Sequence, residues 1–195
     1  MNEAMPVDSG LFAWWRAGDV RARRALIAAA FGWMLDAFDV MLYSMVLASL
    51  MADLGLTKPQ AGLLGSVTLL AGALGGLIFG VVADRRGRTT ALMGSVLMYS
   101  VFTGLCGVAQ NLWQLATFRV LLGIGMGGEW ASGAALVSET WPAAHRSKAL
   151  GFTQSAWAIG YGAAAIVTGL VMPRYGWRAV FFVGMLPALF TLWVQ

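Results

Sequence analysis

Six long apolar runs limit what this sequence can fold into more than any other feature. A helix needs about 20 mostly apolar residues to cross the hydrocarbon core of a membrane. Hydrophobic residues make up 59% of the chain and charged residues only 11%, whereas soluble domains are roughly 25% charged. We therefore predict an all-α membrane protein. The six expected transmembrane helices are residues 25–51, 60–83, 90–109, 112–138, 149–172 and 176–195.

The ends of this bundle follow from the same pattern. Residues 1–24 are a polar and aromatic segment ahead of the first span, and we expect residues 25–195 to form one bundle whose last helix is truncated. Trp113, Trp141 and Trp177 fall at predicted helix ends, where indole rings commonly anchor at the membrane surface. The one cysteine, Cys106, excludes an internal disulfide and is expected to be a small packing residue.

The charges outside the spans predict the orientation of the chain. Nine lysines and arginines fall on the side of the N-terminus and three on the other side. Under the positive-inside rule this places the N-terminus in the cytoplasm of a multi-pass protein in a cell (inner) membrane. The net charge of +4 comes from these loops, so we expect a lipid bilayer as the partner and no nucleic acid. The nine residues are Arg16, Arg21, Arg23, Arg24, Arg85, Arg86, Arg88, Arg146 and Lys148.

The spans form two groups of three, joined at the short link of Gln110 and Asn111. An odd number of spans in each group means that the second group enters the membrane in the opposite direction. This arrangement is compatible with the 3+3 inverted repeats that are common in transporters.

Four ionisable residues lie inside the spans, where charge is expensive and usually functional. At about 1.5 Å per residue, Asp36 and Asp39 lie ~16 and ~21 Å along the first span. Arg119 falls at a similar depth on the fourth span, so we expect an Asp/Arg cluster. Either it is a proton switch, which two acids against one arginine favour, or it is a static ion pair. Glu129 is expected near the inner end of its span, where it could reach a loop arginine.

Three residues of the fifth span share one helix face at i, i+3 and i+7 spacing: Gln154, Trp157 and Tyr161. An amide, an indole and a phenol suit a hydroxylated or ring-bearing small-molecule substrate. The alternative is hydrogen bonding and packing between helices, which is common in membrane proteins.

The charged turn between the second and third spans carries a family resemblance. Its pattern is Gly80-x-x-x-Asp84-Arg85-x-Gly87-Arg88, which resembles the signature loop of the major facilitator superfamily. Arg119-x-x-x-Gly123-x-Gly125 and Glu139-x-x-Pro142-x-x-x-Arg146 are similar to further motifs of that family. Asp36-Ala37-Phe38-Asp39 resembles the paired aspartates of acid:proton symporters, and Gly128-Glu129-Trp130 resembles sialic-acid-type transporters.

The resemblance implies a fold, a function and residue roles. The fold would be the N-terminal six-helix bundle of a transporter with about twice as many spans, so the C-terminal bundle would be missing from this chain. The function would be proton-coupled symport of a sialic-acid-, aromatic-acid- or sugar-acid-like compound by alternating access, with the proton as coupling ion and no cofactor or metal. Asp36, Asp39 and Arg119 would couple protons, and Gln154, Trp157 and Tyr161 would bind substrate. The cytoplasmic gate would comprise Gly80, Asp84, Arg85, Gly87, Arg88, Glu139 and Arg146.

Other functions remain as alternatives. The transporter could instead be a facilitated-diffusion or sugar-porter-type carrier, or the chain could be a non-transporting six-span scaffold. An enzyme is not expected, because a membrane enzyme would need a catalytic cluster of histidine and acidic residues, and the single histidine, His145, lies in a loop where we expect it to be solvated.

Overall fold

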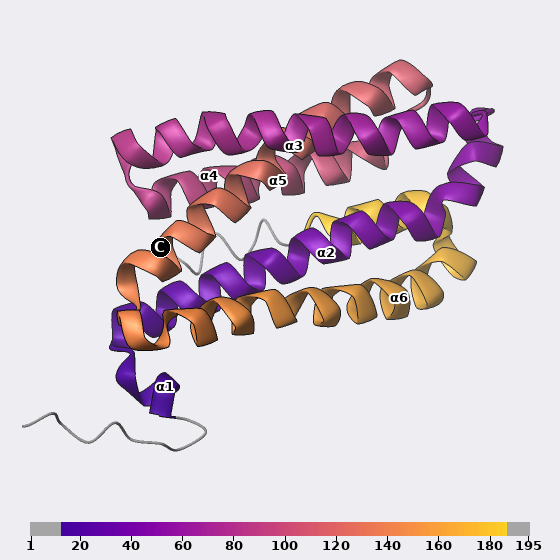
Figure 1. The fold of residues 1–195 in the computed structure, drawn as a ribbon. Coiled ribbons are helices and arrows are strands. Elements are labelled where there is room, and N and C mark those ends of the chain that lie inside the picture. Colours follow the sequence, from indigo (N-terminus) through magenta and orange to yellow (C-terminus); the bar gives the residue numbers. More distant parts are fainter. Residues whose placement is uncertain (1–12, 187–195) are drawn as a thin grey trace, which may run out of the picture.

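The computed structural model describes residues 13–186, and over that range the chain is helical, without strands (Figure 1). Five of the described helices are long and apolar enough to cross a membrane, which confirms the predicted all-α membrane fold. The elements are α1 (Ala13–Ala17), α2 (Val20–Leu54), α3 (Lys58–Arg86), α4 (Arg88–Cys106), α5 (Leu112–Thr140), the short turn η1 (Ala143–His145) and α6 (Arg146–Gly184).

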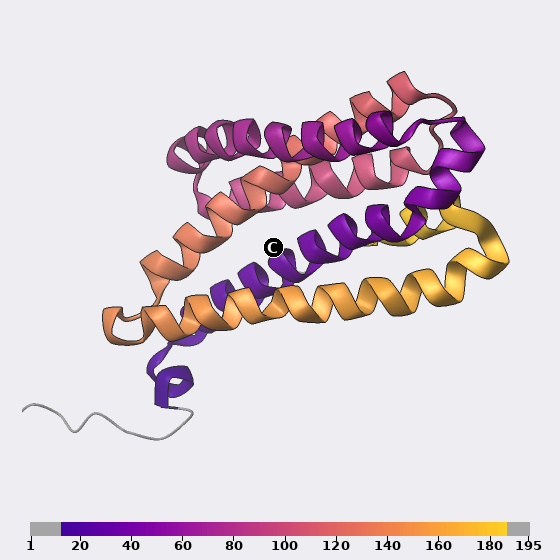
Figure 2. The ribbon, with the colours of Figure 1, turned by 45° about the vertical axis from the view of Figure 1, so that its right-hand side comes forward.

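A break inside α6 marks the start of the sixth span. Gly176 has φ 75° and ψ 176°, a left-handed backbone conformation that glycine adopts without strain. Just beyond it, Arg178 pairs with Asp53 at the end of α2. Further on, Gly184 lies against Thr103 of α4. The chain therefore turns back at Gly176 and runs along α2 in the opposite direction to the rest of α6 (Figure 2).

Helix ends differ from the predicted ones where capping residues act. α2 begins at Val20 rather than at residue 25, because the Asp19 carboxylate accepts a hydrogen bond from the Ala22 amide at 2.7 Å. Such a cap satisfies a backbone donor that the first helical turn leaves free. The predicted truncation of the last helix concerns residues 187–195, which lie outside the described residues.

The helices pack in a pattern that repeats between the two groups of three. α2, the first helix of the first group, packs mainly on α6, which holds the second span of the second group. In the reverse sense, α5 packs mainly on α3. The third helix of each group also packs on the first helix of the other group: α4 packs on α5, and residues 177–184 pack along α2. These exchanged contacts are what two inverted three-helix repeats produce.

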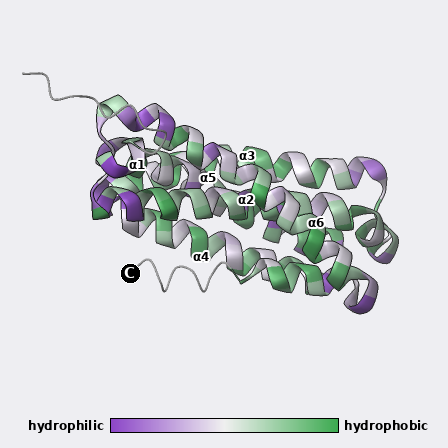
Figure 3. Cartoon of the chain, turned by 90° about the horizontal axis from the view of Figure 1, so that it is seen from below, coloured by the Kyte–Doolittle hydropathy of each residue, from purple (hydrophilic) through white to green (hydrophobic). Residues whose placement is uncertain are grey.

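Polar residues gather at the two ends of the bundle and apolar residues cover its middle (Figure 3). We call the end where α2 begins, where α3 meets α4 and where α5 meets α6 the basic end, because nine arginines and lysines lie there. The opposite end is called the far end. The nine residues are Arg16, Arg21, Arg23, Arg24, Arg85, Arg86, Arg88, Arg146 and Lys148.

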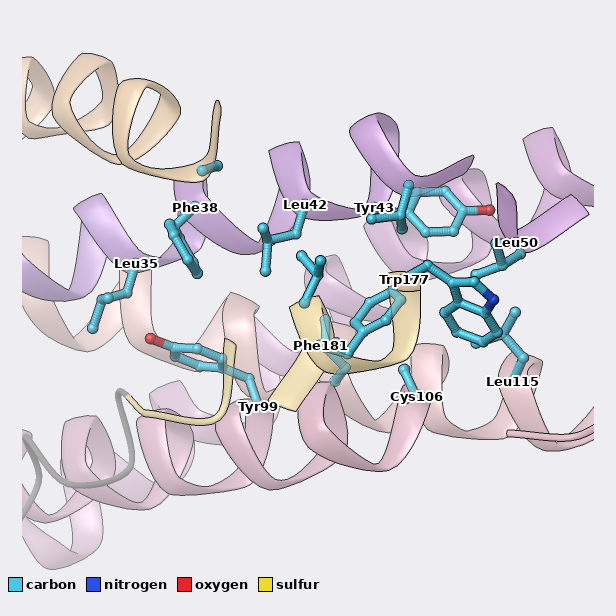
Figure 4. Packing of buried hydrophobic residues seen from close by; sticks show 14 of the residues in the cluster. Leu35, Phe38, Leu42, Tyr43, Leu50, Tyr99, Cys106, Leu115, Trp177 and Phe181 are labelled. Atoms are coloured by element: carbon cyan, nitrogen blue, oxygen red, sulfur yellow. The ribbon is translucent and has the colours of Figure 1, made fainter. Parts of the chain in front are cut away.

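The returning segment supplies much of the core near the far end. Trp177 and Phe181 are buried among side chains of α2, α4 and α5 (Figure 4). The Trp177 indole donates to Asp53 at 3.3 Å, and Arg178 stacks on the same ring. Cys106 is a buried free thiol in this core, as predicted. The segment is therefore fixed to α2 at its start by both packing and charge.

Two of the three tryptophans expected at the membrane surface are instead buried, so that prediction is wrong for them. Trp113 is 80% exposed, but Trp141 is 2% and Trp177 5% exposed. Trp141 is covered by α1, whose Trp14 and Trp15 rings lie 6.0 and 6.4 Å from it. A helix-end tryptophan is buried here because a neighbouring segment folds over it.

Glycines let the helix backbones approach closely where the bundle is tightest. A methyl group at Gly160 of α6 would overlap with the backbone of Met34 on α2, whereas Gly162 has open space around it. Close helix packing through small residues is the usual way that membrane helices associate.

We expect Gly160→Ala to lower the free energy of unfolding by about 1–3 kcal/mol, since the added carbon forces α2 and α6 apart. The matched control, Gly162→Ala, should be neutral or stabilising by up to about 1 kcal/mol, because alanine is the better helix former. Denaturant unfolding in detergent micelles measures both. Equal effects of the two changes would contradict the close α2–α6 contact.

Candidate functional site

Asp39 is a buried carboxylate that is held by one hydrogen bond. It is 2% exposed, and Thr103 on α4 donates to its Oδ1 at 2.8 Å. Its Oδ2 has no hydrogen-bond partner among the described residues. Arg119 is near enough to interact with it electrostatically, yet no ion pair joins the two in the described part of the chain. Asp39 is therefore close to a positive charge without being locked to it.

Arg119 is held by a hydroxyl group and an aromatic ring. This side chain is 3% exposed, and its Nε donates to Thr68 Oγ1 on α3 at 3.1 Å. Its guanidinium carbon lies 3.7 Å from the centre of the Tyr43 ring, and the Tyr43 hydroxyl donates to the Ala61 carbonyl at 2.7 Å. A desolvated cation–π contact of this kind contributes roughly 2 kcal/mol. One guanidinium nitrogen, Nη1, is buried and has no hydrogen-bond partner within residues 13–186, so Arg119 retains a donor for an anion.

Asp36 points to a different partner from the one expected for it. Its carboxyl group and that of Glu129 on α5 are neighbours, and the two side chains are 2% and 1% exposed. The expected contact of Glu129 with a loop arginine is wrong, because α5 continues to Thr140 and buries this position. Gly32, one turn before Asp36, makes room: a Cβ there would overlap with the Glu129 carboxyl group.

A pocket of about 190 Å³ opens between α2, α3, α5 and α6, above Asp36. Three indoles form much of its wall: the Trp33 ring lies 4.2 Å from that of Trp130 and 4.8 Å from that of Trp157. The remaining lining is mostly apolar, with Thr68 contributing a hydroxyl group. The pocket can therefore enclose a flat or hydrophobic group next to a carboxyl group.

The predicted substrate stripe on α6 is divided by the structure. Trp157 lines the pocket, whereas Gln154 is exposed and Tyr161 is 50% exposed, and neither lines it. Sequence reasoning missed Trp33 and Trp130. The signal was present, since Trp33 stands three residues before Asp36 and so shares its helix face.

Ion pairs at the basic end connect the signature turn to α5. Arg88 bonds Asp84 at 2.9 Å and Glu139 at 3.1 Å, and all three side chains are at least 30% exposed. These residues line a wide hollow of about 810 Å³. Arg88 thus ties the start of α4 to the ends of α3 and α5.

In the described part of the chain, the other predicted gate residues take no part in these two ion pairs. Gly87 links α3 to α4 with φ 94°, a value that favours glycine over residues with a side chain. Arg85 and Arg146 are exposed, and Gly80 is partly buried within α3.

Comparison with known proteins places this geometry in a wider context. The sequence pattern of the Major Facilitator Superfamily matches residues 29–194. The sialic acid transporter NanX of Escherichia coli is 40% identical over 183 residues, which cover 94% of this chain and 45% of that protein. The cis,cis-muconate transport protein of Acinetobacter baylyi is 33% identical over 91% of this chain and 43% of that protein. The chain spans less than half the length of these curated relatives.

Solved structures show the same fold. A structure of the proton:xylose symporter XylE superposes with a TM-score of 0.77 at 20% identity, covering 89% of this chain and 44% of that chain. The inward-open conformation of XylE from E. coli gives the same TM-score over 88% of this chain.

Thr103→Val should lower the free energy of unfolding by about 1–3 kcal/mol, because it removes the donor to a buried carboxylate while keeping the side-chain shape. Thr103→Ser keeps the hydroxyl group and should cost less. Denaturant unfolding in detergent compares the two variants. If the serine variant were the less stable one, packing of the methyl group rather than the hydrogen bond would hold this position.

Proposed function

This chain belongs to the major facilitator superfamily, and we propose that it is the N-terminal half of a proton-coupled symporter for an organic acid. Its basic end faces the cytoplasm of a bacterial-type inner membrane, as the excess of positive charge there favours. A C-terminal bundle completes the carrier, and the substrate binds between the two bundles. Transport proceeds by alternating access, in which the substrate site opens to one side of the membrane at a time.

The observation that carries this proposal is the unlocked pair of Asp39 and Arg119. A buried carboxylate that is not fixed to a cation can gain and lose a proton as its surroundings change. The substrate carboxylate binds Arg119 through the free Nη1 donor, and Asp39 then takes a proton from the outer solution. Both leave on the cytoplasmic side, so Asp39 carries one proton inward with each substrate molecule.

The pocket supports an organic acid with a flat or apolar part as the substrate. Relatives whose names specify sialic acid or cis,cis-muconate support the acid class. Trp157 with Trp33 and Trp130 would stack on the apolar part, and Gln154 and Tyr161 would meet the substrate from the open side of α6. Thr68 already accepts a hydrogen bond from Arg119. That bond would break when the substrate draws the Arg119 side chain away.

The bridged cluster at the basic end acts as half of a cytoplasmic gate. Arg88 with Asp84 and Glu139 holds the inner ends of α3, α4 and α5 together. Arg85 and Arg146 are exposed there and are available to the C-terminal bundle. When Arg85 and Arg146 separate from the C-terminal bundle, the cytoplasmic side of the carrier opens.

Asp39→Asn in the full-length carrier should abolish accumulation driven by a pH gradient and retain counterflow exchange, which moves no net proton. Labelled sialic acid, cis,cis-muconate and benzoate serve as probes in proteoliposomes. Asp19→Asn is the matched control, because asparagine caps a helix as well as aspartate does. Unchanged pH-driven accumulation in Asp39→Asn would contradict the proton role. Downhill uptake that never responds to pH would indicate a facilitated-diffusion carrier, and no uptake of any kind a scaffold.

Arg88→Ala should lower the uptake rate several-fold at unchanged expression, since it removes both bridges to Asp84 and Glu139. Arg86→Ala removes the same charge two residues earlier, from an exposed position outside these bridges, and should have little effect. Uptake in cells, normalised to protein in the membrane, measures the difference. Equal rates in the two variants would argue that only the net positive charge of this end matters.

A further inference from the structure

We propose that Asp36 and Glu129 share one proton and form a second proton site beside the indole-lined pocket, separate from Asp39 and Arg119. The inference rests on the proposed proton-coupled function for its role in transport, though not for the existence of the site. It assigns a function to Glu129, which neither the gate nor the Asp39 switch uses.

The contact itself requires the proton. Gly32, one turn before Asp36 on the same face of α2, lies against the Glu129 carboxyl group, so the two carboxyl groups are neighbours. An ionised carboxylate is only an acceptor, so two of them cannot bond, whereas a protonated carboxyl group can donate to an ionised one. The carboxyl group of Glu129 is also fixed in place, because it fills the space above Gly32 and lies beside Gly133.

No positive charge compensates this pair in the described part of the chain. The titratable groups that act on it are Asp39 on α2 and Tyr99 on α4. Arg119 on α5 acts instead on Asp39 and Tyr43. The pocket walls from α3 and α6 contribute Thr68 and Trp157, which do not titrate near neutral pH. Two buried carboxylates without a cation would be very costly, and a shared proton removes one of the charges.

Unpaired polar atoms surround the pair and mark it as an incomplete site. Asp36 Oδ1 and Glu129 Oε2 are buried and have no hydrogen-bond partner among the described residues. The same holds for Ser132 Oγ, one turn after Glu129, and for Trp33 Nε1, one turn before Asp36. Buried polar groups are nearly always satisfied in proteins, so the two carboxyl oxygens are sites for a hydrogen-bond donor and the Trp33 N–H is a site for an acceptor.

The position of Asp36 connects the pair to transport. Asp36 lines the pocket, so the remaining negative charge of the pair faces any anion that enters there. A substrate carboxylate and this charge repel each other. When the pair takes a second proton from the water on the open side, both carboxyl groups become neutral and the repulsion ends. On the other side of the membrane the substrate leaves first, and the pair then loses the second proton. The pair returns to the state in which Asp36 and Glu129 share one proton.

Infrared difference spectroscopy of the full-length carrier in lipid tests the site without any substrate. The wild-type protein should show a protonated-carboxyl C=O band at neutral pH. Glu129→Gln and Asp36→Asn should each abolish or shift that band, because it belongs to the pair, and Asp19→Asn should leave it unchanged. No such band in the wild-type protein, or a band that stays in place in either pair variant, overturns the inference.

A structural role of Glu129 would not produce this spectrum, since glutamine retains the shape and hydrogen bonding of the side chain. Glu129→Asp provides a second check: its shorter side chain separates the two carboxyl groups, and the band should shift although both acids remain. The band is recorded independently of uptake, so a carrier that shows it and transports without protons would refute the proposed function alone. A carrier that accumulates benzoate with a pH gradient but lacks the band would refute the shared proton alone.

Discussion

The cost of placing charge in an apolar bundle organises the interior of this protein. Asp36, Asp39, Arg119 and Glu129 are each at most 3% exposed, and groups of this kind are stable inside a membrane protein only when other polar groups attend them. Their partners come from three different helices: Thr103 from α4, Thr68 from α3 and Tyr43 from α2. Each polar contact therefore fixes the relative position of two helices, and together they determine the depth at which α2, α3, α4 and α5 meet.

Close backbone approach makes those polar contacts possible. α3 meets α5 where Gly72 and Gly127 face each other, and α2 meets α6 at Gly160. Side chains at these positions would hold the helices too far apart for Thr68 to reach Arg119. The α3–α5 contact and the α2–α6 contact correspond to each other when the two three-helix repeats are superposed. The same packing arrangement therefore occurs twice in the chain. The buried polar contacts thus depend on the small residues that let the helices approach closely.

The overall fold could be predicted from the sequence, and the partners within the site could not. The six apolar runs match the apolar core of a membrane, and the unequal loop charges match its two surfaces. Both features can be read from the sequence alone. The depth of Asp36 and Arg119 follows from helix rise, but rotation about each helix axis does not. That rotation turned Asp36 toward Glu129, left Arg119 on Tyr43 and Thr68, and moved Gln154 away from the pocket. The burial of Trp141 depended on α1, a five-residue helix too short to show a periodic pattern.

The clasp of Asp53, Trp177 and Arg178 at the far end has a mechanical consequence. It joins the end of the first spanning helix to the start of the last one, so the two repeats cannot slide past each other there. We therefore expect the bundle to tilt as one rigid body. α2 has 35 residues and is about 52 Å long at ~1.5 Å per residue, so a tilt of about 10° around its middle carries each end through roughly 4.5 Å. That travel exceeds the roughly 4 Å reach of an ion pair, so a small rocking angle is sufficient to part the exposed Arg85 and Arg146 at the opposite end from charges outside this bundle.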